Sequence, residues 1–197
     1  MNFFAYFKKS TFSLVSRNHD TRQQPNQTYF KNQTIFVTGG TGFLGKVMIG
    51  KLLTDCEDIK KIYLLLRSKK GKNTEQRFDE IFEQPCFEFL KLKTSNWKEK
   101  VSLVEGDFNF VIHLAANVRF DQSLKKAASN VKSTADLLEL SKGIVNLKCF
   151  VLVSTAYSNS IHSHIKEEMY DPPVQPEFLF SMVNDLDESV FTNVTPA

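Results

Sequence analysis

Three glycines in one short stretch constrain this chain more than any other feature. Gly39, Gly42 and Gly45 stand in "TIFVTGGTGFLGKVMIGKLL", between an apolar run at 34–37 and an amphipathic run at 43–53. The runs predict a strand and a helix. Glycine at such a junction permits a tight turn, a close approach of backbone to pyrophosphate and close packing of helix on strand. The stretch therefore predicts a dinucleotide-binding loop; no Gly-Lys-Ser/Thr follows, which excludes a kinase-type phosphate loop.

Apolar and amphipathic runs alternate along the rest of the chain. We expect further strands and helices in the following places: strands at 61–66, 101–104, 110–114 and 149–154, and helices at 74–93 (broken at Pro85), 122–141 and 177–191. The strands are Leu-rich or β-branched throughout, which is typical of strands buried on both faces. This pattern predicts an α/β fold with a doubly wound parallel sheet, a Rossmann-type domain. In the helix at 43–53, one side carries Leu44, Val47, Met48 and Leu52.

Composition and charge divide the chain into a tail and one domain. Of the 197 residues, 42% are hydrophobic, enough for a sizeable core. Residues 1–28 hold four cations against one acid, which accounts for the whole net charge of +3. We expect a flexible basic tail at 1–28, with a weak organelle signal as the alternative, and a domain at 29–197. The balanced remainder does not indicate nucleic acid.

Cysteine usage and hydropathy indicate an intracellular chain that does not itself span a membrane. The three cysteines are widely spaced and form no CxxC, which favours free thiols in a reducing compartment. No apolar run approaches the ~18 residues that a membrane span needs. His162 and His164 form His-x-His without a third ligand at recognisable spacing, so no metal site is predicted. We interpret His113, at the end of a strand, as a packing residue.

A cluster of cations follows the second predicted strand of the domain. Arg67 comes directly after the run at 61–66, and Lys69, Lys70 and Lys72 follow it. Enzymes that use NAD usually carry an acid here for the ribose 2′-hydroxyl, whereas a cation suits the 2′-phosphate of NADP. Arg67 therefore favours NADP. The lysines could instead meet the phosphates of a large acidic substrate.

Several short segments together point to one family. The chain contains, in order, "VTGGTGFLGKV", "IKKIYLLLRSKKGK", "EGD", "HLAANVRFD", "NVKST", "FVLVSTAYSN" and "EEMYDPP". Over about residues 29–197 it resembles the extended short-chain dehydrogenases, and more narrowly the amino-terminal part of a fatty acyl-CoA reductase. The resemblance implies an oxidoreductase of lipid biosynthesis that reduces a long-chain fatty acyl-CoA to a fatty alcohol with NADPH. It also implies the cytosolic face of peroxisomal or endoplasmic reticulum membranes, with contact to a membrane surface in a longer form.

The same resemblance implies a set of cofactor-binding residues. Arg67 would take the 2′-phosphate, Asp107 would lie near the adenine, and Ala115 and Ala116 would line the nicotinamide ribose. The residues implied to hold the pyrophosphate are Thr38, Gly39, Thr41, Gly42, Phe43, Leu44 and Gly45.

The resemblance implies only part of a catalytic group. Thr155 would polarise the substrate carbonyl, with Ser154 as the alternative, and Asn130 would support the active site. The family's chemistry also needs a Tyr and a Lys four residues later, which deliver a proton to the developing alkoxide. No tyrosine of this chain is followed by lysine at that spacing. Two alternatives therefore remain: a non-catalytic NADP-binding fragment, and another extended dehydrogenase such as a nucleotide-sugar epimerase.

In the stretch "VEGDFNFVIHLAANV" only five residues of sequence separate two predicted strands. In a sheet of order 3-2-1-4 the two strands are parallel and three positions apart, ~14 Å sideways at ~4.8 Å per step. The chain must also run back by the length of one strand, so the straight line from the end of the first strand to the start of the second is about 22 Å long. The residues from Glu105 to Asn109 span only about 17 Å when fully extended. Parallel strands normally need a dozen or more residues between them. We therefore expect a segment to be missing between Asp107 and Phe110; by resemblance it is a helical connection of about twenty residues.

Overall fold

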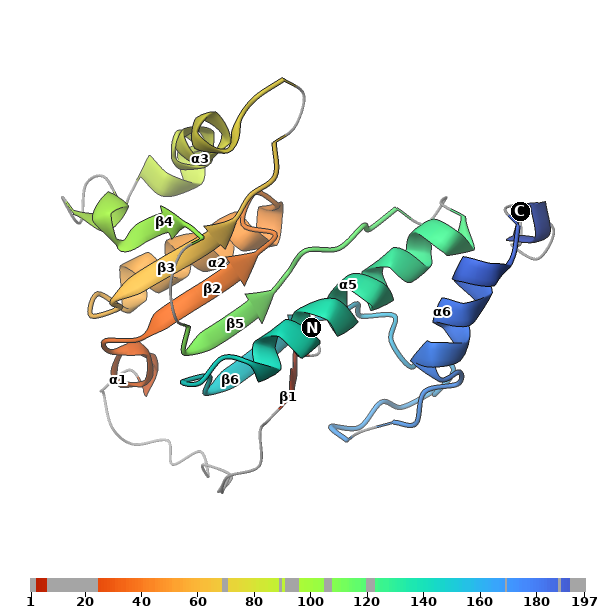
Figure 1. Ribbon diagram of the computed structural model, residues 1–197. Helices are drawn as coiled ribbons and strands as arrows, with labels where there is room; N and C mark the ends of the chain where they lie inside the picture. The colour runs from red at the N-terminus through yellow and green to blue at the C-terminus, as the bar shows by residue number, and fades with distance from the viewer. Residues whose placement is uncertain are drawn as a thin grey trace. The chain divides into compact units, whose positions relative to one another are not determined.

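The computed structural model describes residues 3–6, 25–68, 71–88, 90, 96–104, 108–119, 123–168, 170–187 and 189–191. They fall into two compact units. The sheet unit comprises Phe3–Ala115 and Ile144–Val153, and the helical unit comprises Ala116–Gly143 and Ser154–Ala197 together with Met1–Asn2. All strands of the described part belong to the sheet unit (Figure 1).

The sheet has six strands in the order β1-β6-β5-β2-β3-β4. Their bounds are β1 Phe3–Tyr6, β2 Thr34–Thr38, β3 Lys61–Leu65, β4 Val101–Leu103, β5 Phe110–His113 and β6 Cys149–Val153. The five strands from β6 to β4 are parallel, and only β1 is antiparallel to its neighbour. Every residue of β2 and β5 is buried, as expected for strands covered on both faces. The predicted parallel, Rossmann-type sheet is confirmed.

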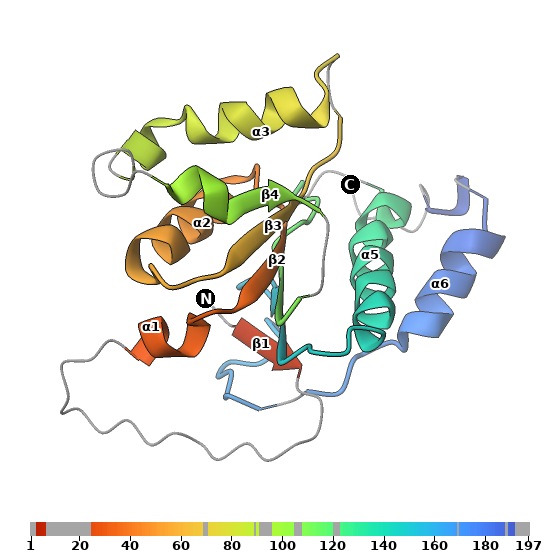
Figure 2. The same ribbon diagram turned by 60° about the vertical axis from the view of Figure 1, so that its left-hand side comes forward.

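Helices follow the strands as the alternation predicts. The sheet unit contains α1 Pro25–Phe30, α2 Phe43–Asp55, α3 Thr74–Phe82 and the 3-10 turns η1 Pro85–Phe87 and η2 Trp97–Lys100. Helices α2 and α3 lie on the same side of the sheet (Figure 2), where Ile49 of α2 and Phe82 of α3 share one buried cluster with Ile62 of β3. The expected break at Pro85 is present, because α3 ends at Phe82. The helical unit contains α5 Leu124–Lys142 and α6 Pro176–Asp185, which pack against each other.

The buried side of α2 agrees only in part with the side that the sequence predicted. Leu52 is buried and Met48 packs against the core, whereas Leu44 and Val47 are 39% and 47% exposed. Ile49 and Leu53 are buried in addition. Gly45 and Gly50 are also buried in this helix. The side of α2 that carries these two glycines therefore faces inward, where the lack of side chains lets the helix approach the sheet closely.

Part of the expected tail is ordered against the sheet. Residues 3–6 form β1, with Phe3 opposite Val153 and Tyr6 opposite Phe150. Three of these four residues are aromatic, and aromatic residues favour strands. The outer edge of β6 offers the backbone N–H and C=O groups that such a strand needs. Helix α1 then begins at Pro25, before the expected boundary at residue 28; residues 7–24 lie outside the described part.

Strands β4 and β5 are parallel and three positions apart, as the sequence predicts. Six residues, 104–109, connect them, because β4 ends at Leu103, one residue before the predicted end of this strand. The earlier end of β4 gives the chain about seven steps between Leu103 and Phe110, at most ~25 Å, which reaches the second strand. Six residues are nevertheless half of the dozen that a helical crossover normally needs.

The last two residues of this connector are fixed on the sheet. The ring of Phe108 stacks on Phe36 at 4.9 Å and meets Tyr63 edge-on at 5.4 Å, so it lies against the middle of β2 and β3. The side chain of Asn109 accepts hydrogen bonds from the backbone N–H of Thr34 at 3.0 Å and from its hydroxyl at 2.9 Å. On this face of the sheet Phe36 and Val111 are buried, whereas Leu65 is 47% exposed. This face of the sheet is therefore covered at Phe36 and Val111 and open to solvent at Leu65.

Candidate nucleotide-binding site

The topology of the sheet places two loops at one point of its edge. Strand β2 has β3 on one side and β5 on the other, so the chain order reverses beside it. Ligands of open α/β sheets bind at such a switch point, beyond the carboxyl ends of the strands. Here Gly39 follows β2 with φ of +75°, and a Cβ at this position would lie 2.7 Å from the backbone nitrogen of Ala115. Only glycine permits this approach of the two loops.

The loop after β2 leads into α2 with its backbone N–H groups available to an anion. The N–H of Gly42 donates to the carbonyl of Gly39 at 2.9 Å, which closes the turn. Gly42 is the N-cap of α2 and has no capping side chain, and the first turn contains no acid. A Cβ on Gly45 would lie 2.3 Å from the Gly39 oxygen, so this position also requires glycine. The uncapped, uncompensated helix start fits a pyrophosphate.

Side chains of the predicted pyrophosphate residues point in different directions. Phe43 is 78% exposed and Leu44 is 39% exposed. These two residues would therefore contribute their N–H groups rather than their side chains. Thr41 is half-buried in the turn. Thr38 is 3% exposed and its hydroxyl is used within the sheet, so its predicted contact with the pyrophosphate is not supported by its side chain.

Thr38 bonds to a residue that sequence reasoning assigned to packing. Its Oγ1 lies 2.6 Å from Nδ1 of His113, at the end of the neighbouring strand β5, and also accepts the N–H of Ala115 at 3.4 Å. His113 is 4% exposed and lies beside the ring of Phe150. Burial lowers the pKa of His113 below its ordinary value of 6.5, so the ring is neutral at pH 7. The one feature of the sequence that indicated a polar contact for His113 was its place in an otherwise apolar buried strand.

The predicted 2′-phosphate residue lies on the same edge of the sheet as the glycine loop. Thr38 and Leu65 are register partners at the ends of β2 and β3, and Arg67 is the second residue after Leu65. The Arg67 side chain is exposed. Residues 66–68 are Leu, Arg and Ser, so no acid follows the strand directly. Asp107, predicted near the adenine, lies outside the described residues.

The predicted catalytic residues belong to the helical unit. The side-chain amide of Asn130 in α5 makes two hydrogen bonds of 2.8 Å with the backbone of Asn117. Its Oδ1 accepts the Asn117 N–H, and its Nδ2 donates to the Asn117 carbonyl. Thr155 is exposed, and its Oγ1 accepts the N–H of Tyr157 at 3.2 Å. Ser154 is half-buried, with its hydroxyl 3.1 Å from that of Ser158. Ala115 closes the sheet unit and Ala116 opens the helical unit, and both are exposed.

Outside this site the described residues include two buried thiols. Cys56 and Cys149 are buried free thiols whose pKa values are raised by burial. Among the described residues, no cluster of His, Cys, Asp or Glu could hold a metal ion. In that same part of the chain, no helix has the length and apolarity that crossing a membrane requires.

Comparison with known families decides which nucleotide-binding domain this is. A family model described as "male sterility protein", an NAD-binding domain, matches residues 37–110 and 107–193. The chain belongs to this family. Membership supports an oxidoreductase family and a nicotinamide cofactor. The predicted resemblance to fatty acyl-CoA reductases is thereby confirmed at the level of the family.

Curated relatives carry the same family identity. The chain is 37% identical over 194 residues to the fatty acyl-CoA reductase "wat" of Drosophila melanogaster, covering 88% of this chain and 37% of the relative. It is 35% identical over 188 residues to fatty acyl-CoA reductase 1 of Gallus gallus and 34% identical over 188 to human fatty acyl-CoA reductase 2, each covering 85% of this chain and 36% of the relative. The chain thus spans little more than a third of these proteins.

Solved structures support the fold. A thiolation-reductase di-domain from an archaeal non-ribosomal peptide synthetase aligns with TM-score 0.52 and 22% identity, over 65% of this chain and 29% of that one. The reductase domain of a non-ribosomal peptide synthetase from Mycobacterium tuberculosis aligns with TM-score 0.50 and 22% identity, over 66% and 35%. At this identity the likeness concerns the fold alone.

The comparisons also bear on the connector between β4 and β5. The two stretches matched by the family model meet at residues 107–110. The alignment with the Drosophila protein runs over 194 positions, whereas 88% of 197 residues is about 173, which leaves about 21 positions without a residue of this chain. The Gallus alignment, with 188 positions against about 167 residues, leaves about the same number. The break in the family match lies beside Phe108, and the alignment lengths indicate about twenty positions of these relatives that this chain lacks.

We expect the stability of the sheet unit to decrease as His113 becomes protonated. The unfolded chain binds a proton at His113 below about pH 6.5, whereas the buried ring resists it, so lower pH favours unfolding. The free energy of unfolding should fall by up to about 1.4 kcal/mol per pH unit below pH 6.5. Urea titrations at pH 7.5, 6.5 and 5.5 measure it. His113→Asn should remove this part of the slope, and His162→Asn, on an exposed loop, should not. An unchanged slope in His113→Asn would contradict the assignment.

We expect the source transcript to encode a further segment between Asp107 and Phe110. A skipped exon or a faulty gene model is the simplest origin, and Asn109 should follow the segment because its bonds to Thr34 already fix it at the start of β5. Full-length sequencing of the transcript tests this. Mature messages that all join Asp107 to Phe110 through Phe108 and Asn109 alone, with a cooperatively melting product, would show that the connector is native.

Proposed function

We propose that the sheet unit binds NADPH and that this chain is the cofactor-binding part of a fatty acyl-CoA reductase. The observation that carries the proposal is the uncapped glycine start of α2 at the switch point, beside the strand β3, which is followed by Arg67 and by no acid in residues 66–68. The first feature fits a dinucleotide pyrophosphate and the second fits a 2′-phosphate rather than a free 2′-hydroxyl. NADPH, when bound, supplies a hydride.

The proposed substrate is a long-chain fatty acyl-CoA, and the proposed product of the complete enzyme is a fatty alcohol. The names of the curated relatives support the substrate class. In the helical unit, Thr155 is the proposed hydroxyl donor to the substrate carbonyl, because it is exposed and directly follows the strand β6 and Ser154. Asn130 holds the Asn117 backbone and so fixes the chain that follows Ala115 and Ala116. The proposed location, the cytosolic face of peroxisomal or endoplasmic reticulum membranes, has the family resemblance as its support.

A second candidate function is nucleotide binding without turnover. The observation that favours it is that no Tyr-x-x-x-Lys occurs in the 197 residues. Tyr157 is the tyrosine nearest to Thr155, and Ile161 stands four residues after it. A carbonyl reduction then lacks the group that delivers a proton to the alkoxide.

Replacing Arg67 with alanine should weaken NADPH binding more than NADH binding. A lost charge-assisted hydrogen bond is worth roughly 1.5–3 kcal/mol, or about a tenfold to hundredfold change in Kd. Nucleotide fluorescence titrations of the native chain and of Arg67→Ala measure it. Lys60→Ala, an exposed cation that precedes β3 at the opposite end of the strand, is the matched control. Equal losses for NADPH and NADH would remove Arg67 from the 2′-phosphate role.

The 197-residue chain should bind NADPH but not oxidise it in the presence of a long-chain acyl-CoA. Loss of a general acid alone lowers a rate by ~10²–10⁴-fold. The decrease in the absorbance of the reduced nicotinamide, followed with palmitoyl-CoA, measures turnover. A rate that is normal for enzymes, about 1 s⁻¹ or more, would show that a proton donor is present and would overturn the non-catalytic alternative.

A further inference from the structure

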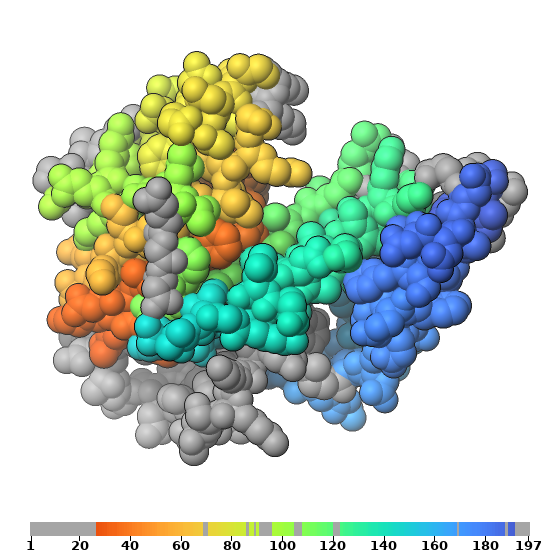
Figure 3. Space-filling model, in the orientation of Figure 1, coloured from red at the N-terminus to blue at the C-terminus, as the bar shows by residue number. Residues whose placement is uncertain are grey.

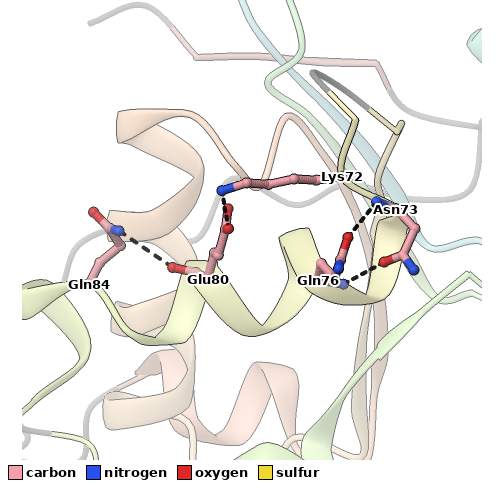
Figure 4. A network of polar contacts seen from close by, with 5 residues as sticks. All are labelled: Lys72, Asn73, Gln76, Glu80 and Gln84. Carbon is pink, nitrogen blue, oxygen red and sulfur yellow. Dashed lines mark hydrogen bonds and ion pairs between the residues drawn. The ribbon is translucent and has the colours of Figure 1, made fainter.

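The helices that follow β2 and β3 begin in different ways. Helix α3, yellow at the surface of the sheet unit in Figure 3, begins with a capping box, in which the side chains of Asn73 and Gln76 each accept the other's backbone N–H (Figure 4). Its own side chains therefore fix its start. Helix α2 begins at Gly42 without a side-chain cap. The glycine loop therefore needs contacts with another segment to hold its position.

That segment is the chain that leaves β5. Gly39 lies so close to it that a Cβ on the glycine would stand 2.7 Å from the nitrogen of Ala115. Thr38 holds this chain in two ways: its carbonyl accepts the N–H of Leu114 at 3.2 Å, and its Oγ1 accepts the N–H of Ala115 at 3.4 Å. The side chain thus continues the strand pairing by one residue. Ala115 and the Gly39 turn are therefore fixed against each other through one hydroxyl group.

His113 orients this hydroxyl group. Its Nδ1 lies 2.6 Å from Oγ1 of Thr38, and the two residues are only 4% and 3% exposed. An oxygen that accepts the N–H of Ala115 still has its own hydrogen to donate, and Nδ1 of a neutral imidazole accepts it. Because Thr38 is β-branched, its χ1 angle is restricted as well. A lone pair of Oγ1 is thereby kept on Ala115, and the ring proton of His113 is on Nε2.

The three strands around this pair bring no charge to it. Within β2 and β5, His113 is the only titratable residue. In β6, Leu152 stands opposite His113, and the one titratable residue of that strand, Cys149, stands opposite Phe110 at the other end. Thr38 and His113 therefore act as an uncharged, hydrogen-bonded unit.

We propose that His113 is a positioning residue for the nicotinamide half of the cofactor. It accepts the hydroxyl hydrogen of Thr38, Thr38 holds the N–H of Ala115, and Ala115 sets the place of the Gly39 turn. The inference rests on the proposed NADPH site and adds a residue that itself touches no ligand. Arg67, the proposed 2′-phosphate residue, follows β3 and lies outside this series of contacts, so the adenosine half is bound without it.

Loss of the acceptor loosens the two loops. Without Nδ1, the hydroxyl of Thr38 either keeps a buried hydrogen without a partner or rotates and takes its lone pair from Ala115. The Gly39 turn and Ala115 then have more freedom, and ordering them when the cofactor binds costs affinity. A pyrophosphate and a nicotinamide ribose at these loops lose affinity for this reason, whereas a ligand that ends at the adenosine 5′-phosphate loses little.

The experiment compares NADPH with 2′,5′-ADP, which is the adenosine half of the same cofactor. Binding of each to the full chain is measured by calorimetry. His113→Leu keeps an apolar side chain without an acceptor, and Thr38→Val removes only the hydroxyl. We expect each variant to bind NADPH about fivefold or more weakly and 2′,5′-ADP within about twofold of the native chain. The double variant should be no weaker than either single one, because both changes remove the same contact.

Three further variants distinguish positioning from packing. His113→Asn places an amide oxygen near the position of Nδ1 and should bind NADPH as the native chain does. Thr38→Ser keeps the hydroxyl and should do the same; if His113→Leu does not fold, the comparison of Thr38→Val with Thr38→Ser decides. Thr34→Val is the matched control, because it removes a hydroxyl that donates to Asn109 Oδ1 at 2.9 Å at the opposite end of β2. It should leave the ratio of the two affinities unchanged.

The other outcomes separate this inference from the proposed function. If His113→Leu and Thr38→Val bind both ligands as the native chain does, the NADPH site stands and the role of His113 is wrong. If they weaken both ligands equally, or if His113→Asn is as weak as His113→Leu, the pair supports only the sheet and the inference is again wrong. A native chain that binds NADPH no more tightly than 2′,5′-ADP also overturns the inference. If it binds neither ligand, the proposed function is wrong and the inference fails with it.

Discussion

The pairing of β2 with β5 is the interaction on which the rest of the sheet unit depends. It is held at both ends by side chains: Asn109 bonds to Thr34 where the strands begin, and His113 lies 2.6 Å from the Thr38 hydroxyl where they end. Between these points every residue of both strands is buried. Because β3 occupies the other side of β2, this pairing creates the switch point. The glycine loop, Ala115 and Arg67 all take their positions from it.

Much of the sheet unit follows from local sequence. The glycines at positions 39, 42 and 45 predict a strand–turn–helix unit because each requirement is short in range: a positive φ, a close approach and a small residue at the helix start. Parallel order follows from the alternation of buried runs and amphipathic helices. Hydrophobicity predicts the inward positions of Met48 and Leu52 in α2 but not those of Gly45 and Gly50, which are buried although they have no side chain.

The parts of the site that sequence reasoning missed depend on contacts between distant residues. His113 and Thr38 are 75 positions apart, and their bond follows only from the register of β5 on β2. The short connector between β4 and β5, in contrast, could be recognised in the sequence, because backbone dimensions fix both the spacing of strands and the reach of the chain.

The antiparallel strand β1 has a consequence for how the sheet can grow. It pairs with β6 from Phe150 to Val153, four of the five residues of that strand, and so uses the backbone groups on the outer edge of β6. A sheet accepts a new strand only through unpaired N–H and C=O groups at its edge. Any additional strand could therefore join beside β6 only by displacing Phe3–Tyr6, and the amino-terminal residues close that edge of the sheet.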